Sequence, residues 1–172
     1  MAGTRRWLML CLMLGFSLSA HAQWRADLPE ARLVGQGEFT WFGLRLYNAR
    51  TWSPAAPLDW SRPFALELTY NRNLSRDTLV EASVDEMRRL GGPGLDEATL
   101  ARWTAVMQEA FVDVRPGMRI TGLYLPGQGC RFYVDEQLRR EVDDAAFARA
   151  FFAIWLDPRA RDPQLRQRLV GR

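Results

Sequence analysis

Two arginines and two tyrosines on otherwise apolar, strand-like segments are the residues of this chain best suited to bind a small molecule. Arg45, Tyr47 and Arg50 lie in segment 44–52, and Tyr70 and Asn71 end segment 64–71. Side chains alternate along extended backbone, which puts Arg45 and Tyr47 on one face and Arg50 on the other. A guanidinium beside a phenol at an apolar cleft can hold a carboxylate or phenolate by charge-assisted hydrogen bonds. We therefore predict a ligand-binding site at these five residues.

The alternative for the same residues is purely structural. Arginines on strands are mostly exposed to solvent, and Tyr47 would then be a core residue with its hydroxyl at the rim. Which of Arg45 and Arg50 faces a cleft stays open at this point.

The first 22 residues have the features of a secretory signal peptide. Arg5 and Arg6 precede an apolar run of 13 residues, and Ala20-His21-Ala22 forms a small-residue cleavage site. The run is shorter than the roughly 17–25 residues that cross a bilayer. We predict cleavage near Ala22, a periplasmic or secreted domain at 23–172, and no stable membrane span.

The composition of residues 23–172 excludes several kinds of site. This segment has no histidine and one cysteine, Cys130, so neither a Ser-His-Asp triad nor a structural zinc site can form, and we expect no metal and no cofactor. Its 21 arginines face 20 acidic residues, and a net charge of +1 does not indicate nucleic-acid binding. Gly35-Gln36-Gly37 lacks the third glycine and following helix of a dinucleotide loop and is interpreted as flexibility at the start of a strand.

The pattern of apolar residues predicts strands, two helices, strands and two more helices. Strands are expected at 32–41, 44–52, 64–70, 118–125, 130–134 and 137–142, with a hairpin turn at Phe42-Gly43. Helices are expected after Ser75, Asp96, Asp143 and Asp162, and residues before 31 are expected to be a short polar lead. This order predicts an α+β fold with an antiparallel sheet covered on one face by helices.

Several stretches of the chain resemble the bacterial chalcone isomerase-like proteins. These stretches are LVGQG (33–37), LYNAR (46–50), FALELTY (64–70), LSR (74–76), DEM (85–87), 117–127 and FFAIWLDP (151–158). The resemblance implies an open-faced β-sandwich, in which a ligand cleft lies between an antiparallel sheet and a layer of helices. The plant enzymes of this fold close a flavanone ring, whereas other members bind fatty acids through an arginine and a tyrosine.

The residues that the plant enzymes use for ring closure are mostly replaced in this sequence. Glu38, Phe39 and Thr40 stand where the enzymes have an arginine after Gly-x-Gly. Tyr47 falls where the enzymes have threonine and the fatty-acid binders have tyrosine, and Asn71 falls near the enzymes' lysine. Leu79 and Glu86 fall near the tyrosine and asparagine of the next helix.

Three functions are therefore carried forward. The first is non-catalytic binding of a small apolar, acidic or fatty-acid-like ligand in the periplasm. The second is an isomerase of the intramolecular lyase kind, acting on a chalcone-like enone. The third is an envelope interaction module with a filled interior and an exposed apolar patch around Trp52 and Trp60. A cleft between sheet and helices would favour the first two.

Overall fold

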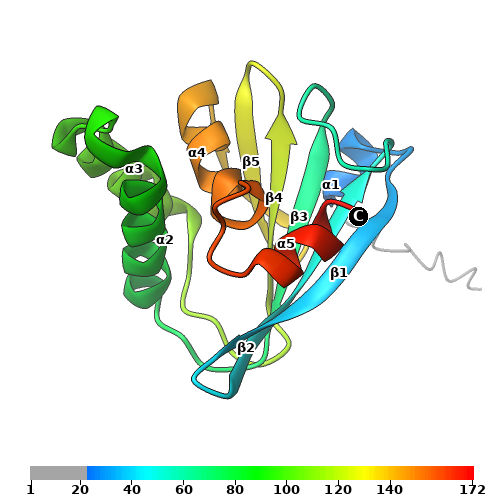
Figure 1. The fold of residues 1–172 in the computed structure, drawn as a ribbon, viewed down its shortest axis with the longest axis horizontal. Coiled ribbons are helices and arrows are strands. Elements are labelled where there is room, and N and C mark those ends of the chain that lie inside the picture. Colours follow the sequence, from blue (N-terminus) through cyan, green and yellow to red (C-terminus); the bar gives the residue numbers. More distant parts are fainter. Residues whose placement is uncertain (1–22) are drawn as a thin grey trace, which may run out of the picture.

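The computed structural model describes residues 23–172, and the predicted signal peptide at 1–22 lies outside the described residues. Six strands form one antiparallel sheet in the order of the chain: β1 (Arg32–Trp41), β2 (Leu44–Ser53), β3 (Phe64–Tyr70), β4 (Arg119–Leu125), β5 (Gly129–Val134) and β6 (Gln137–Val142). The helices are α1 (Gln23–Asp27), α2 (Arg76–Gly91), α3 (Glu97–Ala110), α4 (Ala145–Leu156) and α5 (Pro163–Leu169), with a short 3₁₀ turn, η1, at Gly92–Gly94. Figure 1 shows α2 to α5 on one side of the sheet. The predicted α+β open-faced sandwich is confirmed.

Side-chain alternation on the central strands separates two apolar clusters. On β3, Phe64, Leu66, Leu68 and Tyr70 pack beneath the helical layer, and Ala65 belongs to a second cluster on the opposite face. Most of β3 and β4 is buried on both faces, whereas β6 is exposed along most of its length. The predicted hairpin at Phe42-Gly43 is present, and it joins β1 to β2.

The helices begin where polar caps satisfy their first backbone N–H groups. Ser75 and Asp96 cap α2 and α3 as expected, and Asp162 caps α5 through a 2.9 Å bond from the Leu165 N–H. Helix α4 is capped by Asp144, one residue after the position predicted. Helix α2 packs on α3 and α4, and α5 packs on β1, so α2 reaches the sheet mainly through its neighbours.

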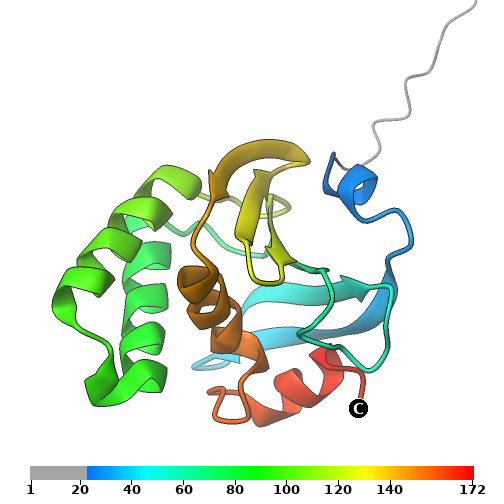
Figure 2. The same cartoon turned by 90° about the horizontal axis from the view of Figure 1, so that it is seen from above.

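The residues before 31 form a structured element, and the expected polar lead is wrong. Helix α1 lies on the side of the sheet opposite α4 and α5 (Figure 2), where Trp24 is fully buried against Trp52, Ala65 and Tyr133. Asp27 accepts a 2.8 Å hydrogen bond from the Tyr133 hydroxyl. A helix of five residues is too short to show a helical periodicity in the sequence. Its stability comes from tertiary packing.

The sheet, its helical layer and both apolar clusters are formed within residues 23–172. We therefore expect this segment to fold by itself. Among its helices, none combines the length and the apolar character that crossing a membrane requires.

Gly122 of β4 is predicted to set the distance between the sheet and α4. A Cβ built on Gly122 would lie 2.8 Å from the Phe152 ring, which is fully buried and meets Phe64 and Tyr124 at 5.3 and 5.5 Å. Gly122→Ala should lower the free energy of unfolding by about 1–3 kcal/mol because the core is overpacked. Denaturant unfolding checks this. Combining it with Phe152→Leu should cost less than the sum of the two single changes.

Gly94 supplies the control for this prediction, because a Cβ there would meet no atom within 4 Å. Gly94→Ala should leave stability nearly unchanged. Equal losses from the two glycine substitutions would contradict the role given to Gly122.

Candidate functional site

A cavity of about 420 Å³ lies between the sheet and the helices, beside α2. Its floor comes from β1, β2 and β3, and its walls come from α2, α4 and the segment that leads into α5. The apolar side chains of the lining include Phe39, Trp41, Leu46, Leu68, Leu79, Phe111, Phe151, Ile154, Trp155 and Leu165. The volume is that of a small-molecule pocket, and the lining has the apolar character typical of one.

Two tyrosine hydroxyls supply polar groups on the floor of the cavity. Tyr47 and Tyr70 are paired across β2 and β3, and their rings meet edge to face at 5.9 Å. The Tyr47 hydroxyl accepts a 2.9 Å hydrogen bond from the Trp155 indole N–H of α4, so its own proton is free to be donated. The Tyr70 hydroxyl has no hydrogen-bond partner within residues 23–172, although the residue is only 5% exposed. Both hydroxyls can therefore donate to an oxygen of a bound molecule.

Burial keeps both phenols protonated. Desolvation raises the pKa of Tyr47, an effect that the hydrogen bond from Trp155 only partly offsets. Desolvation also raises the pKa of Tyr70, and the neighbouring Tyr47 adds to the shift. The cavity floor thus presents neutral hydrogen-bond donors at physiological pH and not phenolate ions.

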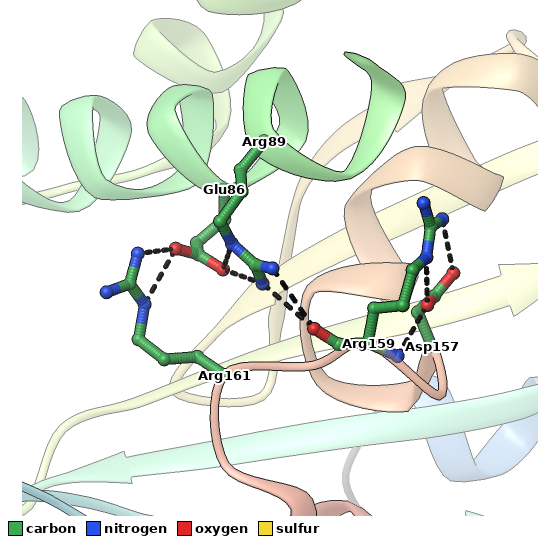
Figure 3. A network of polar contacts seen from close by, with 5 residues as sticks. All are labelled: Glu86, Arg89, Asp157, Arg159 and Arg161. Carbon is green, nitrogen blue, oxygen red and sulfur yellow. Dashed lines mark hydrogen bonds and ion pairs between the residues drawn. The ribbon is translucent and has the colours of Figure 1, made fainter.

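A carboxylate held by two arginines joins two walls of the cavity (Figure 3). Glu86 of α2 is 9% exposed, and its carboxylate accepts bonds from Arg89 at 2.7 Å and 3.1 Å and from Arg161 at 2.8 Å. Arg161 lies in the segment between α4 and α5, and a second nitrogen of its guanidinium also contacts Glu86. Arg89 in turn donates to the Arg159 carbonyl at 3.1 Å. Helix α2 is thereby connected to the segment that precedes α5.

The two arginines determine the ionisation of Glu86. Burial of the carboxyl opposes ionisation, but the hydrogen bonds and charges of Arg89 and Arg161 outweigh it, so the pKa of Glu86 is lowered. The positive charge of Arg161 is consequently shared with a carboxylate of the protein before any ligand enters. Asp85 and Asp162, which also line the cavity, are held by Arg88 and by the α5 N-terminus.

The structure places the five predicted site residues in different environments. Tyr47 and Tyr70 lie together in the cavity lining, whereas Arg45, Arg50 and Asn71 are not part of it. Asn71 instead continues the pairing of β3 with β2, because its backbone N–H donates to the Leu46 carbonyl at 2.9 Å.

A β-bulge separates Arg45 from Tyr47. The register of β1 with β2 shifts so that Phe39 pairs with Tyr47 and Thr40 pairs with Arg45, which leaves Leu46 as an extra residue. Leu46 and Tyr47 therefore both reach the cavity. Arg45 pairs across with Thr40 and lies 3.5 Å from Glu38, on the other face of the hairpin. The expectation that Arg45 and Tyr47 share a face is wrong for this reason.

Arg50 also lies on the face away from the cavity; the alternation had placed it opposite Tyr47 and left open which arginine would face a cleft. It is 3.9 Å from the Glu67 carboxylate, which is 3.8 Å from Arg119 on its other side. Arg50 and Arg119 line an open polar groove on that face.

The sequence did not predict the polar contacts that Glu86, Arg161 and Trp155 form at the cavity. Glu86 and Arg161 are 75 residues apart, and neither stands in a motif that indicates an ion pair. Trp155 lies on α4, in the helix expected after Asp143, but nothing in its spacing indicates a bond to Tyr47, 108 residues away. The only available signal was the resemblance, which placed Leu79 and Glu86 at enzyme site positions, and both line the cavity.

Comparison with known proteins identifies the family. A model of chalcone isomerase-like proteins matches residues 44–171. The chain belongs to the chalcone isomerase-like family. An uncharacterized protein of Haemophilus influenzae is 24% identical over 166 residues, which are 96% of this chain and 77% of that protein. A fatty-acid binding protein of Arabidopsis thaliana has a similar fold, with a TM-score of 0.62 and 13% identity, over 83% of this chain and 87% of that one.

Glu86 is predicted to stabilise this chalcone isomerase-like protein only while its carboxyl is ionised. Because its pKa is lowered on folding, the contribution is present above the unfolded value near 4.5 and is lost as pH falls through the folded value. Glu86→Gln should cost about 1–3 kcal/mol at pH 7 by denaturant unfolding. The difference from the wild type should shrink in acid.

Asp85→Asn is the matched control, since Asp85 is the adjacent residue and forms a solvent-exposed pair with Arg88 at 3.4 Å. That change should have little effect at either pH. A loss in Glu86→Gln that is independent of pH would contradict an ionic role.

Proposed function

We propose that this protein binds a small, largely apolar molecule that carries a terminal oxygen group, such as a fatty acid, and that it does so without catalysis. The observation that carries the proposal is an apolar cavity of about 420 Å³ whose floor presents two neutral phenol donors. An apolar tail fits the lining, and a carboxyl or carbonyl oxygen can accept from Tyr47 and Tyr70. The fold shared with a fatty-acid binding protein supports the same class of ligand.

The carboxylates of the cavity favour binding over catalysis. A general base needs a group that is free to take a proton at a tuned pKa. Glu86 is occupied by two arginines, Asp162 caps a helix, and Asp85 pairs with Arg88. The isomerase hypothesis would therefore depend on the phenols and Arg161 alone.

The two phenols are predicted to select ligands by their oxygen group. Tyr70→Phe and Tyr47→Phe should each weaken binding of a fluorescent fatty acid about tenfold, because a hydrogen bond to a carboxylate is lost. They should change the affinity for a hydrocarbon dye of similar size very little. Tyr124→Phe is the control, because Tyr124 is buried away from the cavity lining. Direct titration measures all three variants.

Solvent extraction and mass spectrometry of the purified protein provide an independent check. A co-purified fatty acid, or a higher melting temperature when one is added, supports the proposal. Absence of both, with no response to other apolar carboxylates or enones, would rule out binding in this cavity. Turnover of a chalcone above the rate in buffer would instead favour the isomerase.

We also propose that the protein acts in the periplasm or outside the cell, after removal of residues 1–22. Sequencing of the exported protein should find Gln23 as the first residue. Trp24 is fully buried, and Gln23 accepts a 3.0 Å bond from the Leu138 N–H, so cleavage further into the chain would remove contacts of α1 with the sheet. An N-terminus beyond Trp24, or full-length protein kept in the cytoplasm, would refute this location.

A further inference from the structure

Three of the five large hydrophobic residues that are exposed within residues 23–172 lie in or beside the turn between β1 and β2. We call residues 41–44 the hairpin tip. Phe42 is 89% exposed, and its neighbours Trp41 and Leu44 are 42% and 47% exposed. Contiguous exposed apolar side chains of this kind mark a binding surface more often than scattered single ones do.

The backbone of the hairpin tip makes Phe42 an unexpected residue. Phe42 has φ +47° and Gly43 has φ +74°, a pair of positive angles for which asparagine followed by glycine is preferred. A bulky side chain in this region is disfavoured. Phe42 has one aromatic partner, the Trp41 ring at 5.1 Å, and is otherwise open to water. Phe42 thus lowers the stability of the fold twice, through its positive φ and through its exposed ring. A residue kept at such a cost indicates a role in function and not in folding.

The hairpin tip is continuous with the cavity. Trp41 belongs to the cavity lining, stacks on Phe39 at 6.3 Å and has the Arg161 guanidinium 5.3 Å from its ring. Figure 1 shows the β1–β2 hairpin extending beyond the neighbouring ends of β3 and β4. A surface that bound the tip would therefore lie next to one side of the cavity.

One ion-paired and one unpaired arginine lie near the hairpin tip, within residues 23–172. The Arg45 side chain is 72% exposed, with Glu38 at 3.5 Å as its partner. Arg72 follows Asn71, whose N–H bonds to Leu46, so Arg72 lies alongside the same end of β2. Arg72 is exposed and forms no ion pair with the residues that the structure describes. Tryptophan is enriched where proteins meet the lipid headgroup region, and an unpaired arginine beside it is attracted to anionic lipid.

The other apolar candidates of the described chain are covered or isolated. Trp52 and Trp60, around which an exposed patch was expected, lie beneath the guanidiniums of Arg25 at 4.1 Å and Arg149 at 3.7 Å. That expectation is wrong. Leu33 and Leu138 are 45% and 46% exposed at other parts of the sheet and provide controls of similar exposure.

We propose that the hairpin tip inserts into the headgroup region of an anionic phospholipid bilayer, with Phe42 and Trp41 in the interface and Arg72 near lipid phosphates. Docking in this orientation brings the apolar cavity close to the membrane, where an apolar ligand is stored. The docking does not require a ligand, so it can be tested separately from the binding function.

Vesicle flotation with residues 23–172 tests the proposal, since the apolar run at 7–19 would itself bind lipid. Wild-type protein should float with vesicles of phosphatidylethanolamine and phosphatidylglycerol, and less with phosphatidylcholine alone. Phe42→Asn should reduce partition about tenfold. Its melting temperature should stay the same or rise, because asparagine suits the turn better. Arg72→Gln should reduce partition about fivefold on the anionic vesicles only.

Leu33→Asn is the matched control and should float like the wild type. Failure of the wild type to bind either vesicle would overturn the proposal and leave the tip as a contact for another protein. Equal flotation of Phe42→Asn and wild type would also overturn it, as would an equal loss in Leu33→Asn. A lower melting temperature in Phe42→Asn would refute the claim that Phe42 is costly to the fold.

Discussion

The carboxylate of Glu86, held between Arg89 and Arg161, is the contact on which the cavity depends. Helix α2 packs on α3 and α4 and not chiefly on the sheet, so its distance from β1 and β2 is set indirectly. The ion pairs connect it to the segment before α5, which itself packs on β1. The desolvation cost of a buried carboxylate can exceed the gain from one ion pair, and here two arginines share in offsetting it. The wall is therefore held by polar contacts at the edge of a space that side chains leave open.

This arrangement changes how a ligand would be recognised. A free arginine in an apolar cavity would attract a carboxylate strongly, but Arg161 already shares its charge with Glu86. Recognition of an oxygen group then falls to Tyr47 and Tyr70, whose raised pKa values keep them as neutral donors. Neutral donors bind an ionised carboxylate, a protonated acid or a carbonyl with smaller differences between them than a charged group would. The cavity is thus suited to a class of apolar molecules and not to one anion.

The features that the sequence predicted correctly depend on contacts between residues close together in the chain. Strand alternation in 64–70 and the caps at Ser75, Asp96 and Asp162 are local, and these predictions agree with the structure. The sequence was also sufficient to predict that Tyr47 and Tyr70 face a cleft, because both lie on predicted strands.

The predictions that were wrong concern residues whose contacts lie in distant segments of the chain. The extra residue at Leu46 moves Arg45 to the other face, and no local pattern marks such a bulge. Gly35, interpreted as strand flexibility, instead permits close approach of α5, since a Cβ there would lie 1.7 Å from the Arg168 carbonyl oxygen. Both errors have one cause: the partner that gives the residue its role lies elsewhere in the chain.

The same bulge has a consequence for the whole β1–β2 hairpin. With Leu46 inserted, Leu46 and Tyr47 both reach the cavity, while Phe39 and Trp41 keep their regular alternation on the opposite strand and also line it. One hairpin therefore supplies a phenol at the floor, an indole at the rim and an exposed phenyl ring at its end. A bulge also increases the local twist of a strand pair. The hairpin extends past its neighbours because β3 ends at Tyr70, opposite Tyr47, and its contact with β2 continues only to the bond from the Asn71 N–H to Leu46.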